Sequence, residues 1–209
     1  MPRIPLGFKI AWTAWVALWA CAYGVHHRHD GALWQFLWFC DVANFVITLG
    51  LWIESPLILS WQALSVVVVQ LLYLVDAGSR FLFGFHPFGG TGFLFDGSTP
   101  VHISILSVTL HALTPAVLLW GVKRLGYDRR ALPVQAIAAA VLLAAGYAAG
   151  ADRNINWSHG PFGGRQTLVP PLAYLAVAVL GYTLLLYWPT HLFLSRVWPG
   201  ARVPSRLDA

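Results

Sequence analysis

The stretch that decides the fold is residues 32–76, ALWQFLWFCDVANFVITLGLWIESPLILSWQALSVVVVQLLYLVD. It holds two apolar segments of about 20 residues each, the length that an α-helix needs to cross the hydrocarbon core of a bilayer. Glu54, Ser55 and Pro56 separate the two segments. So short a connection predicts a tight turn, and the two helices should be antiparallel neighbours.

Four further apolar stretches flank this pair. Of the whole chain, 58% is hydrophobic and only 10% charged, whereas a soluble domain has about 25% charged residues. The sequence therefore predicts an all-α, polytopic integral membrane protein, with six transmembrane helices in one bundle and a single domain over residues 1–209. The predicted helices cover residues 7–25, 32–53, 56–76, 100–122, 131–150 and 168–194.

Lysine and arginine are distributed unequally between the two faces of this predicted bundle. Cytoplasmic loops carry an excess of these residues, so the richer face predicts that both termini are cytoplasmic and that the protein lies in the cell (inner) membrane. Because the basic residues cluster at helix ends, the net charge of +5 does not indicate nucleic-acid binding. The inner face has Arg3, Lys9, Lys123, Arg124, Arg129, Arg130, Arg196, Arg202 and Arg206, and the outer face Arg28, Arg80, Arg153 and Arg165.

Two ionisable residues, Asp41 and His111, lie near the middle of the predicted helices 32–53 and 100–122. A charge at that depth costs at least about 2.5 kcal/mol, so an intramembrane ionisable residue indicates a function by default. Gln70, on the third helix, approaches the same depth from the other side. Further polar residues share a helix face with the two ionisable ones: Asn44 and Thr48 with Asp41, and Ser104, Ser107 and Thr114 with His111.

These polar helix faces allow two interpretations. In the first, the Asp41 carboxylate orients the His111 imidazole, which acts as a general base or acid in a pocket of low dielectric. In the second, an Asp–His hydrogen bond only holds the helices together. Function is favoured, because a neutral pair would join helices at a lower desolvation cost.

Other candidate sites are weaker. His26, His27 and His29 have side chains that bind metals, but adjacent histidines at a helix end rarely point at one ion, so no metal site is predicted. Two loops of the outer face contain a similar sequence motif, His86–Gly90 (HPFGG) and His159–Gly164 (HGPFGG). Turns rich in proline and glycine explain it, and a paired site for lipid headgroups is the alternative.

Segments along nearly the whole chain resemble a family of small bacterial multi-pass membrane proteins, and this resemblance implies no activity. The segments are Phe36–Asp41 (FLWFCD), Leu51–Leu57 (LWIESPL), Phe95–Asp96 (FD), His111–Pro115 (HALTP), Arg124–Arg130 (RLGYDRR), Asn154–Trp157 (NINW) and Pro189–Leu192 (PTHL).

A fainter resemblance carries chemistry. The run Trp34–Asp41, with a later histidine before a proline on the fourth helix, is similar to the androgen-induced-gene membrane hydrolases. Those six-helix proteins cleave fatty-acid esters with an intramembrane threonine and histidine. His111 matches the family histidine, with a difference of one residue in its distance to the proline. Trp38 stands at the threonine position and excludes that nucleophile, so the resemblance implies a six-helix shape, a buried histidine and a pocket open to lipid.

Two functions follow as hypotheses. The first is a membrane-embedded lipid hydrolase or acyl or headgroup transferase, with His111 as base, Asp41 as its orienter and Asn44 stabilising the oxyanion. The second is a non-catalytic transporter, lipid-binding protein or subunit of a membrane complex. Membrane lipids are the expected partners, homo-oligomers and partner subunits both stay open, and no cofactor is assigned. The residues expected to bind substrate are Arg80, Arg153, Arg165, Gln70 and Ser107.

Overall fold

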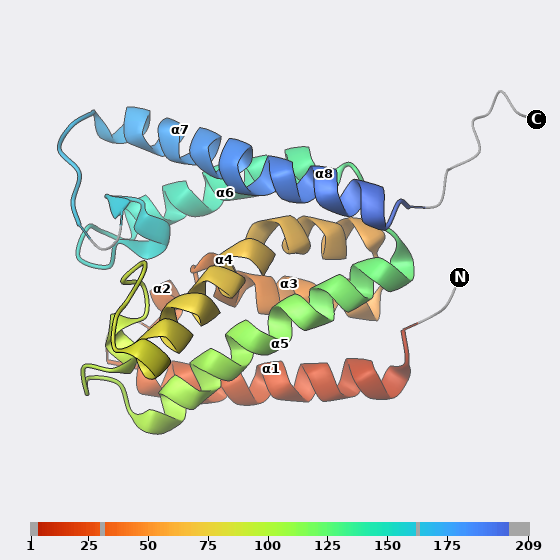
Figure 1. The fold of residues 1–209 in the computed structure, drawn as a ribbon, viewed down its shortest axis with the longest axis horizontal. Helices are drawn as coiled ribbons and strands as arrows, with labels where there is room; N and C mark the ends of the chain where they lie inside the picture. The colour runs from red at the N-terminus through yellow and green to blue at the C-terminus, as the bar shows by residue number, and fades with distance from the viewer. Residues whose placement is uncertain (1–3, 30–31, 162–163, 201–209) are drawn as a thin grey trace, which may run out of the picture.

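The structure is a computed structural model that describes residues 4–29, 32–161 and 164–200. Within these residues the fold is helical and contains no β-strand, which confirms the predicted all-α class (Figure 1). Arg3, Arg202 and Arg206, counted above for the inner face, lie outside the described residues. The helices are α1 (Leu6–His26), α2 (Ala32–Gln35), α3 (Phe39–Trp52), α4 (Pro56–Phe83), η1 (Gly92–Leu94), α5 (Val101–Leu125), α6 (Ala131–Ala148), η2 (Ile155–Trp157), α7 (Pro171–Tyr182), the π-helical η4 (Thr183–Tyr187) and α8 (Trp188–Val197).

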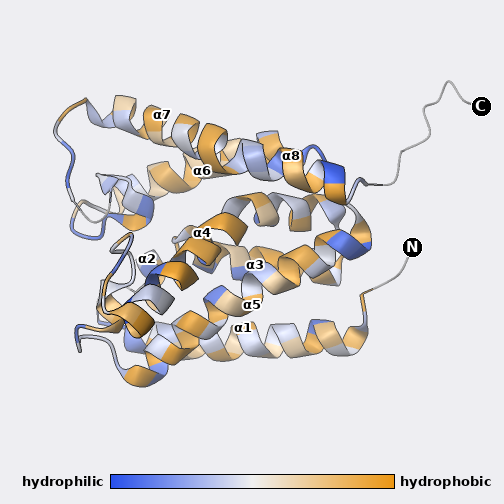
Figure 2. Cartoon of the chain, viewed as in Figure 1, coloured by the Kyte–Doolittle hydropathy of each residue, from blue (hydrophilic) through white to orange (hydrophobic). Residues whose placement is uncertain are grey.

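Five of the helical segments are long and apolar enough to cross a membrane: α1, α4, α5, α6 and the continuous segment Pro171–Val197. They run lengthwise beside one another, and the connections gather at the two ends (Figure 1). Figure 2 shows hydrophobic residues along the helices and hydrophilic ones mainly at the ends and in the loops. The start of α1 and the end of α8 lie at the same end of the molecule.

The helix predicted over residues 32–53 is broken, and that prediction of one continuous helix is wrong. α2 ends at Gln35 and α3 begins at Phe39. The side chain of Asn156, from the distant η2, lies at the break. Its Nδ2 donates to the carbonyl of Leu37 at 2.8 Å, and its Oδ1 accepts from the N–H of Phe39 at 2.9 Å. One amide thus satisfies backbone groups that a continuous helix would have paired, and α3 keeps 14 residues, about 21 Å.

The turn between α3 and α4 is as short as predicted, and the two helices are antiparallel neighbours. Ser55 caps α4 by accepting from the N–H of Ile58 at 3.3 Å, and Pro56 occupies the first turn, where its missing N–H costs nothing. Small residues let the helices approach closely. A Cβ on Gly50 of α3 would lie 2.7 Å from Ile58, and one on Gly121 of α5 would lie 2.8 Å from Leu59. α4 therefore packs between α3 and α5 and forms the centre of the bundle.

Candidate functional site

A hydrogen bond between two fully buried residues sets the register of α3 against α5. The hydroxyl of Thr114 donates to Oδ1 of Asn44 at 3.0 Å. The two helices run in the same direction (Figure 1), and Asp41 and His111 each stand three residues before a member of this bond. Both ionisable residues therefore lie about one turn from the bond, on the same side of it. They are at a common level in the bundle, as the sequence predicted.

The imidazole of His111 is held by its own helix and by α4. Its Nδ1 lies 2.7 Å from the carbonyl oxygen of Ser107. A carbonyl only accepts hydrogen bonds, so Nδ1 carries the proton and Nε2 offers its lone pair. The ring stacks on Tyr73 with centroids 3.7 Å apart and planes 11° apart, and the Tyr73 hydroxyl lies 2.8 Å from the Ser107 hydroxyl. Tyr73 and Ser107 together fix the orientation of the imidazole.

Asp41 lies in the first turn of α3, and its side chain is 5% exposed. The positive end of the helix dipole favours a carboxylate there. Among the described residues, the one hydrogen bond to its side chain comes from the neighbouring thiol of Cys40, at 3.5 Å. Among the residues that the structure describes, the Asp41 carboxyl group is bonded to no other helix.

No hydrogen bond or ion pair joins Asp41 to His111 in the part of the chain that the structure describes. The nitrogen that an orienting carboxylate would bond, Nδ1 of His111, is bonded to the carbonyl of Ser107 instead. Asp41 therefore does not position the imidazole. The second interpretation expected a hydrogen bond between Asp41 and His111 that only holds the helices together, and the described residues do not form that bond either.

Gln70 is fully buried on α4, and in the part of the chain that the structure describes neither polar atom of its amide group has a hydrogen-bond partner. An unpaired buried polar group costs about 1–3 kcal/mol, so it calls for a physical explanation. Gln70 stands three residues before Tyr73 on the same helix, so the two lie on one face. An orphaned amide one turn from the rings of Tyr73 and His111 is suited to bind a polar group of a ligand.

Asn44 and Ser107 form hydrogen bonds within the bundle that the sequence did not predict. Asn44 accepts from Thr114, and its Nδ2 donates to the carbonyl of Cys40 at 2.6 Å, which leaves one N–H for a ligand. Ser107 supports both Tyr73 and His111. Sequence reasoning missed Tyr73 altogether, although its spacing from Gln70 placed it on the polar face of α4.

The three arginines expected to bind a headgroup are exposed at the loop end of the bundle, and within the described residues no hydrogen bond joins them to one another. Arg80 donates to the carbonyl of Gly84, and Arg153 to that of Ala149 at 2.8 Å. Arg165 forms an ion pair with Asp152 at 2.6 Å.

Sequence reasoning also missed Asp76, a buried carboxylate near the end of α4. It accepts hydrogen bonds from the backbone N–H groups of Phe88, Gly89 and Thr91 at 2.7, 3.0 and 2.9 Å. The Thr91 hydroxyl donates to it at 2.6 Å, and Nδ1 of His86 lies 3.3 Å away. Through these hydrogen bonds Asp76 holds the loop that begins with the motif His86–Gly90 against the end of α4.

In the second loop the side-chain amide of Asn154 forms the corresponding hydrogen bonds. Oδ1 of Asn154 accepts from the N–H of His159 at 2.8 Å, and its Nδ2 donates to the carbonyls of Gly160 and Gly164 at 2.9 and 3.3 Å. Residues 162 and 163 lie outside the described part of the chain. In each loop, the described residues of the motif therefore bond to one buried Asp or Asn side chain. These hydrogen bonds explain the similar motif in both loops as a structural feature.

Among the described residues, no group of three or more His, Cys, Asp or Glu side chains could hold a metal ion. Compared with protein families, with curated proteins and with solved structures, the chain gives no match. What the protein does must therefore be inferred from the chemistry of the Asp41, Tyr73 and His111 region alone.

Proposed function

We propose that the chain is a multi-pass protein of the bacterial inner membrane that acts on lipids at a buried site formed by Asp41, Gln70, Tyr73 and His111. Six crossings are proposed, in which α2, α3 and the residues between them make up the second. Both termini are cytoplasmic. The five long apolar helices, the common end of α1 and α8, and the excess of lysine and arginine at that end support this topology.

One observation carries the proposal of a functional site. Within the described residues, the side chains of Asp41 and His111 form no hydrogen bond to another helix, whereas Asn44–Thr114 and Tyr73–Ser107 do join helices. Hydrogen bonding between helices therefore does not explain why two costly ionisable side chains lie at this depth, although the His111 ring stacks on Tyr73 of α4. A role towards a ligand does explain it.

The chemistry that suits these residues is hydrolysis or transfer of an acyl group. Nε2 of His111 takes a proton from a water or an acceptor hydroxyl as that oxygen attacks the ester carbonyl. The proton then passes to the leaving oxygen as the carbon–oxygen bond breaks. The Gln70 amide and the remaining N–H of Asn44 donate to the developing oxyanion. Arg80, Arg153 and Arg165 attract an anionic headgroup at the outer face. The faint resemblance to androgen-induced-gene hydrolases is consistent with this chemistry.

The test is the substitution His111→Asn in the purified full chain. The Asn amide can still donate to the carbonyl of Ser107, but it has no basic nitrogen. Turnover of a lipid panel, followed by mass spectrometry, should fall by about 10²–10⁴-fold. The matched control is His102→Asn, an exposed histidine on the same helix, which should keep wild-type turnover. Equal turnover by a folded His111→Asn protein would reject His111 as the base.

A second candidate is a carrier whose transport is coupled to protons. The absence of a bond between Asp41 and His111 favours it, because two separate groups can take up protons independently. A carrier would turn over no lipid, and Asp41→Asn would abolish proton-driven uptake into proteoliposomes.

A further inference from the structure

Half of the twelve phenylalanines of the chain lie in one short segment, residues 81–95 (FLFGFHPFGGTGFLF), which covers the end of α4 and the loop after it. Between Arg80 and Asp96 the only ionisable side chain of this segment is that of His86. All six rings are between 40% and 80% exposed: Phe81, Phe83, Phe85, Phe88, Phe93 and Phe95. A gathering of exposed apolar side chains of this size marks a surface that is covered by something other than water.

The exposed apolar surface continues from the segment onto both helices that it connects. On α4, Leu71, Val75 and Leu82 are all exposed, and their spacing places them on one face of the helix. On α5, Val101 and Ile105 are exposed and share a face in the same way. Both helices are among those long and apolar enough to cross a membrane. The segment therefore extends a surface that the topology proposed above places against lipid.

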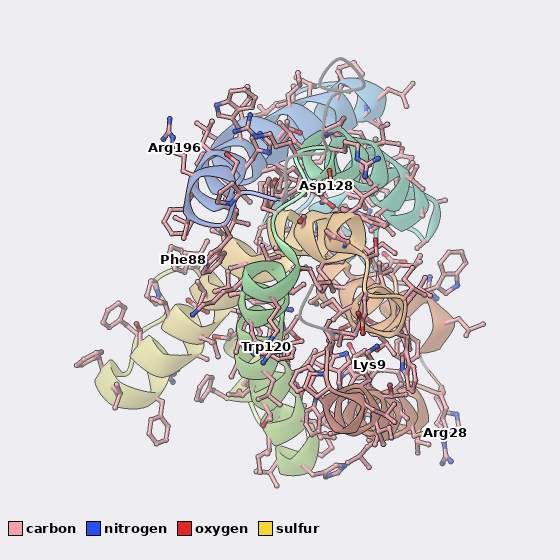
Figure 3. The ribbon with its side chains drawn as sticks, turned by 90° about the vertical axis from the view of Figure 1, so that its right-hand side faces the viewer. Lys9, Arg28, Phe88, Trp120, Asp128 and Arg196 are labelled. Atoms are coloured by element: carbon pink, nitrogen blue, oxygen red, sulfur yellow. The ribbon has the colours of Figure 1, made fainter. Side chains whose placement is uncertain are left out.

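α4 is also longer than one crossing of a bilayer requires. Its 28 residues extend about 42 Å, whereas the hydrocarbon core is about 30 Å thick. A helix that is too long is accommodated by tilting. Figure 3 views the bundle from its other end and shows the last turns of α4 to one side of the other helices, with Phe88 on that side. The tilt carries the end of α4 and the attached loop sideways, towards the surrounding lipid.

The loop is able to leave water because its backbone is paired within the protein. The N–H groups of Phe88, Gly89 and Thr91 donate to the buried carboxyl group of Asp76. Irregular backbone is tolerated at membrane depth only where the protein satisfies its polar groups. These hydrogen bonds hold N–H groups of the loop towards α4, while its phenylalanine rings remain exposed.

Lipid suits this surface better than a second protein chain does. Interfaces between proteins have a polar rim and are enriched in arginine, whereas residues 81–95 contain no arginine and a single ionisable side chain. Phenylalanine and leucine are the residues that a segment lying in the membrane surface buries at the boundary between headgroups and acyl chains.

We propose that residues 81–95 form an interfacial anchor, whose phenylalanine rings insert among the phospholipids of the outer leaflet. The loop between α4 and α5 then lies within the membrane surface and not in the water above it. Arg80 and Asp96, which bound the segment, reach the headgroup layer. The anchor rests on the membrane insertion proposed above but not on the catalytic role of His111.

The depth of single spin labels tests the anchor in the full chain, reconstituted into vesicles of phosphatidylcholine and phosphatidylglycerol. The two native cysteines are first replaced by Cys21→Ala and Cys40→Ser, so that a hydroxyl can still donate to Asp41. A label is then attached at Phe88→Cys or at Phe93→Cys. Both side chains are exposed, so their replacement leaves the core intact.

Two control positions bracket the expected depths. Val75→Cys places a label on the exposed apolar face of α4, and Ser98→Cys places one in the same loop beyond Asp96. Power saturation of the EPR signal measures the collisions of each label with oxygen, which concentrates in lipid, and with a water-soluble nickel chelate. At Phe88 and Phe93 the ratio of oxygen to nickel collisions should be several-fold higher than at Ser98 and close to that at Val75.

A ratio at Phe88 and Phe93 equal to that at Ser98 would place the loop in water and overturn the proposal. Few collisions with either reagent would also overturn it, because the rings would then be covered by protein, either a second copy or another subunit. If the label at Val75 also collides mainly with nickel, the insertion proposed for α4 is wrong and the anchor is wrong with it. None of these results depends on the turnover of His111→Asn, so failure of the catalytic proposal is recognised separately.

Discussion

Asp41 and Asp76 are both buried aspartates in apolar helices, yet their surroundings differ completely. Asp76 is 1% exposed and receives four hydrogen bonds from the loop that follows α4, with His86 beside it. Asp41 is 5% exposed and receives one, from the thiol next to it. A carboxylate that is fully bonded offsets its desolvation by organising structure, whereas one left nearly unbonded retains the capacity to act on a ligand.

The largest expected effect on stability is at Asp76. Asp76→Ala should lower the free energy of unfolding by about 3–5 kcal/mol, because three backbone N–H groups and a hydroxyl lose a charged acceptor together. Thermal unfolding in detergent micelles measures the loss, and limited proteolysis should cut residues 84–100 faster. An unchanged midpoint would show that the loop keeps its structure without Asp76. The greater number of hydrogen bonds to Asp76 than to Asp41 would then make no difference to stability.

A smaller effect is expected where polar residues join helices without charge. A double-mutant cycle with Asn44→Ala and Thr114→Val should give a coupling energy of about 0.6 kcal/mol, and at most about 1.7, which is typical of interhelical hydrogen bonds in membrane proteins. The same unfolding assay measures it. A coupling energy of zero would leave α3 and α5 without the bond that sets the level of Asp41 and His111.

The smallest effect concerns a carboxylate of the loop between α5 and α6. Hydrogen bonds from Arg130, at 2.7 Å in the ion pair, and its charge hold the pKa of Asp128 below the usual value. A lowered pKa stabilises the fold at pH values above the unfolded pKa of about 4 and ceases to do so as the pH falls through the folded value. The unfolding midpoint of wild type should therefore fall slightly more than that of Asp128→Asn on acidification from pH 6 to below 4. Parallel curves would contradict this.

Much of the fold could be predicted because apolar length and turn residues are local properties. They indicated the helical class, the turn at Glu54–Pro56 and the common level of Asp41 and His111. The break before α3 could not be predicted, because it depends on Asn156, which is 119 residues from Leu37 in the chain. The spacing of polar residues placed Ser107 and His111 on one face of α5, which meets Tyr73 of α4, but it does not say which atoms bond. For this reason the Asp41–His111 contact was expected, and the role of Tyr73 and Ser107 in holding the imidazole was not.

The same substitution at the two contrasted positions tests the central claim most directly. Asp41→Asn and Asp76→Asn should be compared with wild type in one thermal unfolding experiment. If Asp41 serves a ligand and not the bundle, Asp41→Asn should unfold at the wild-type temperature or above it, while Asp76→Asn unfolds well below. A loss of stability in Asp41→Asn as large as that in Asp76→Asn would mean that both aspartates are structural, and would contradict the account.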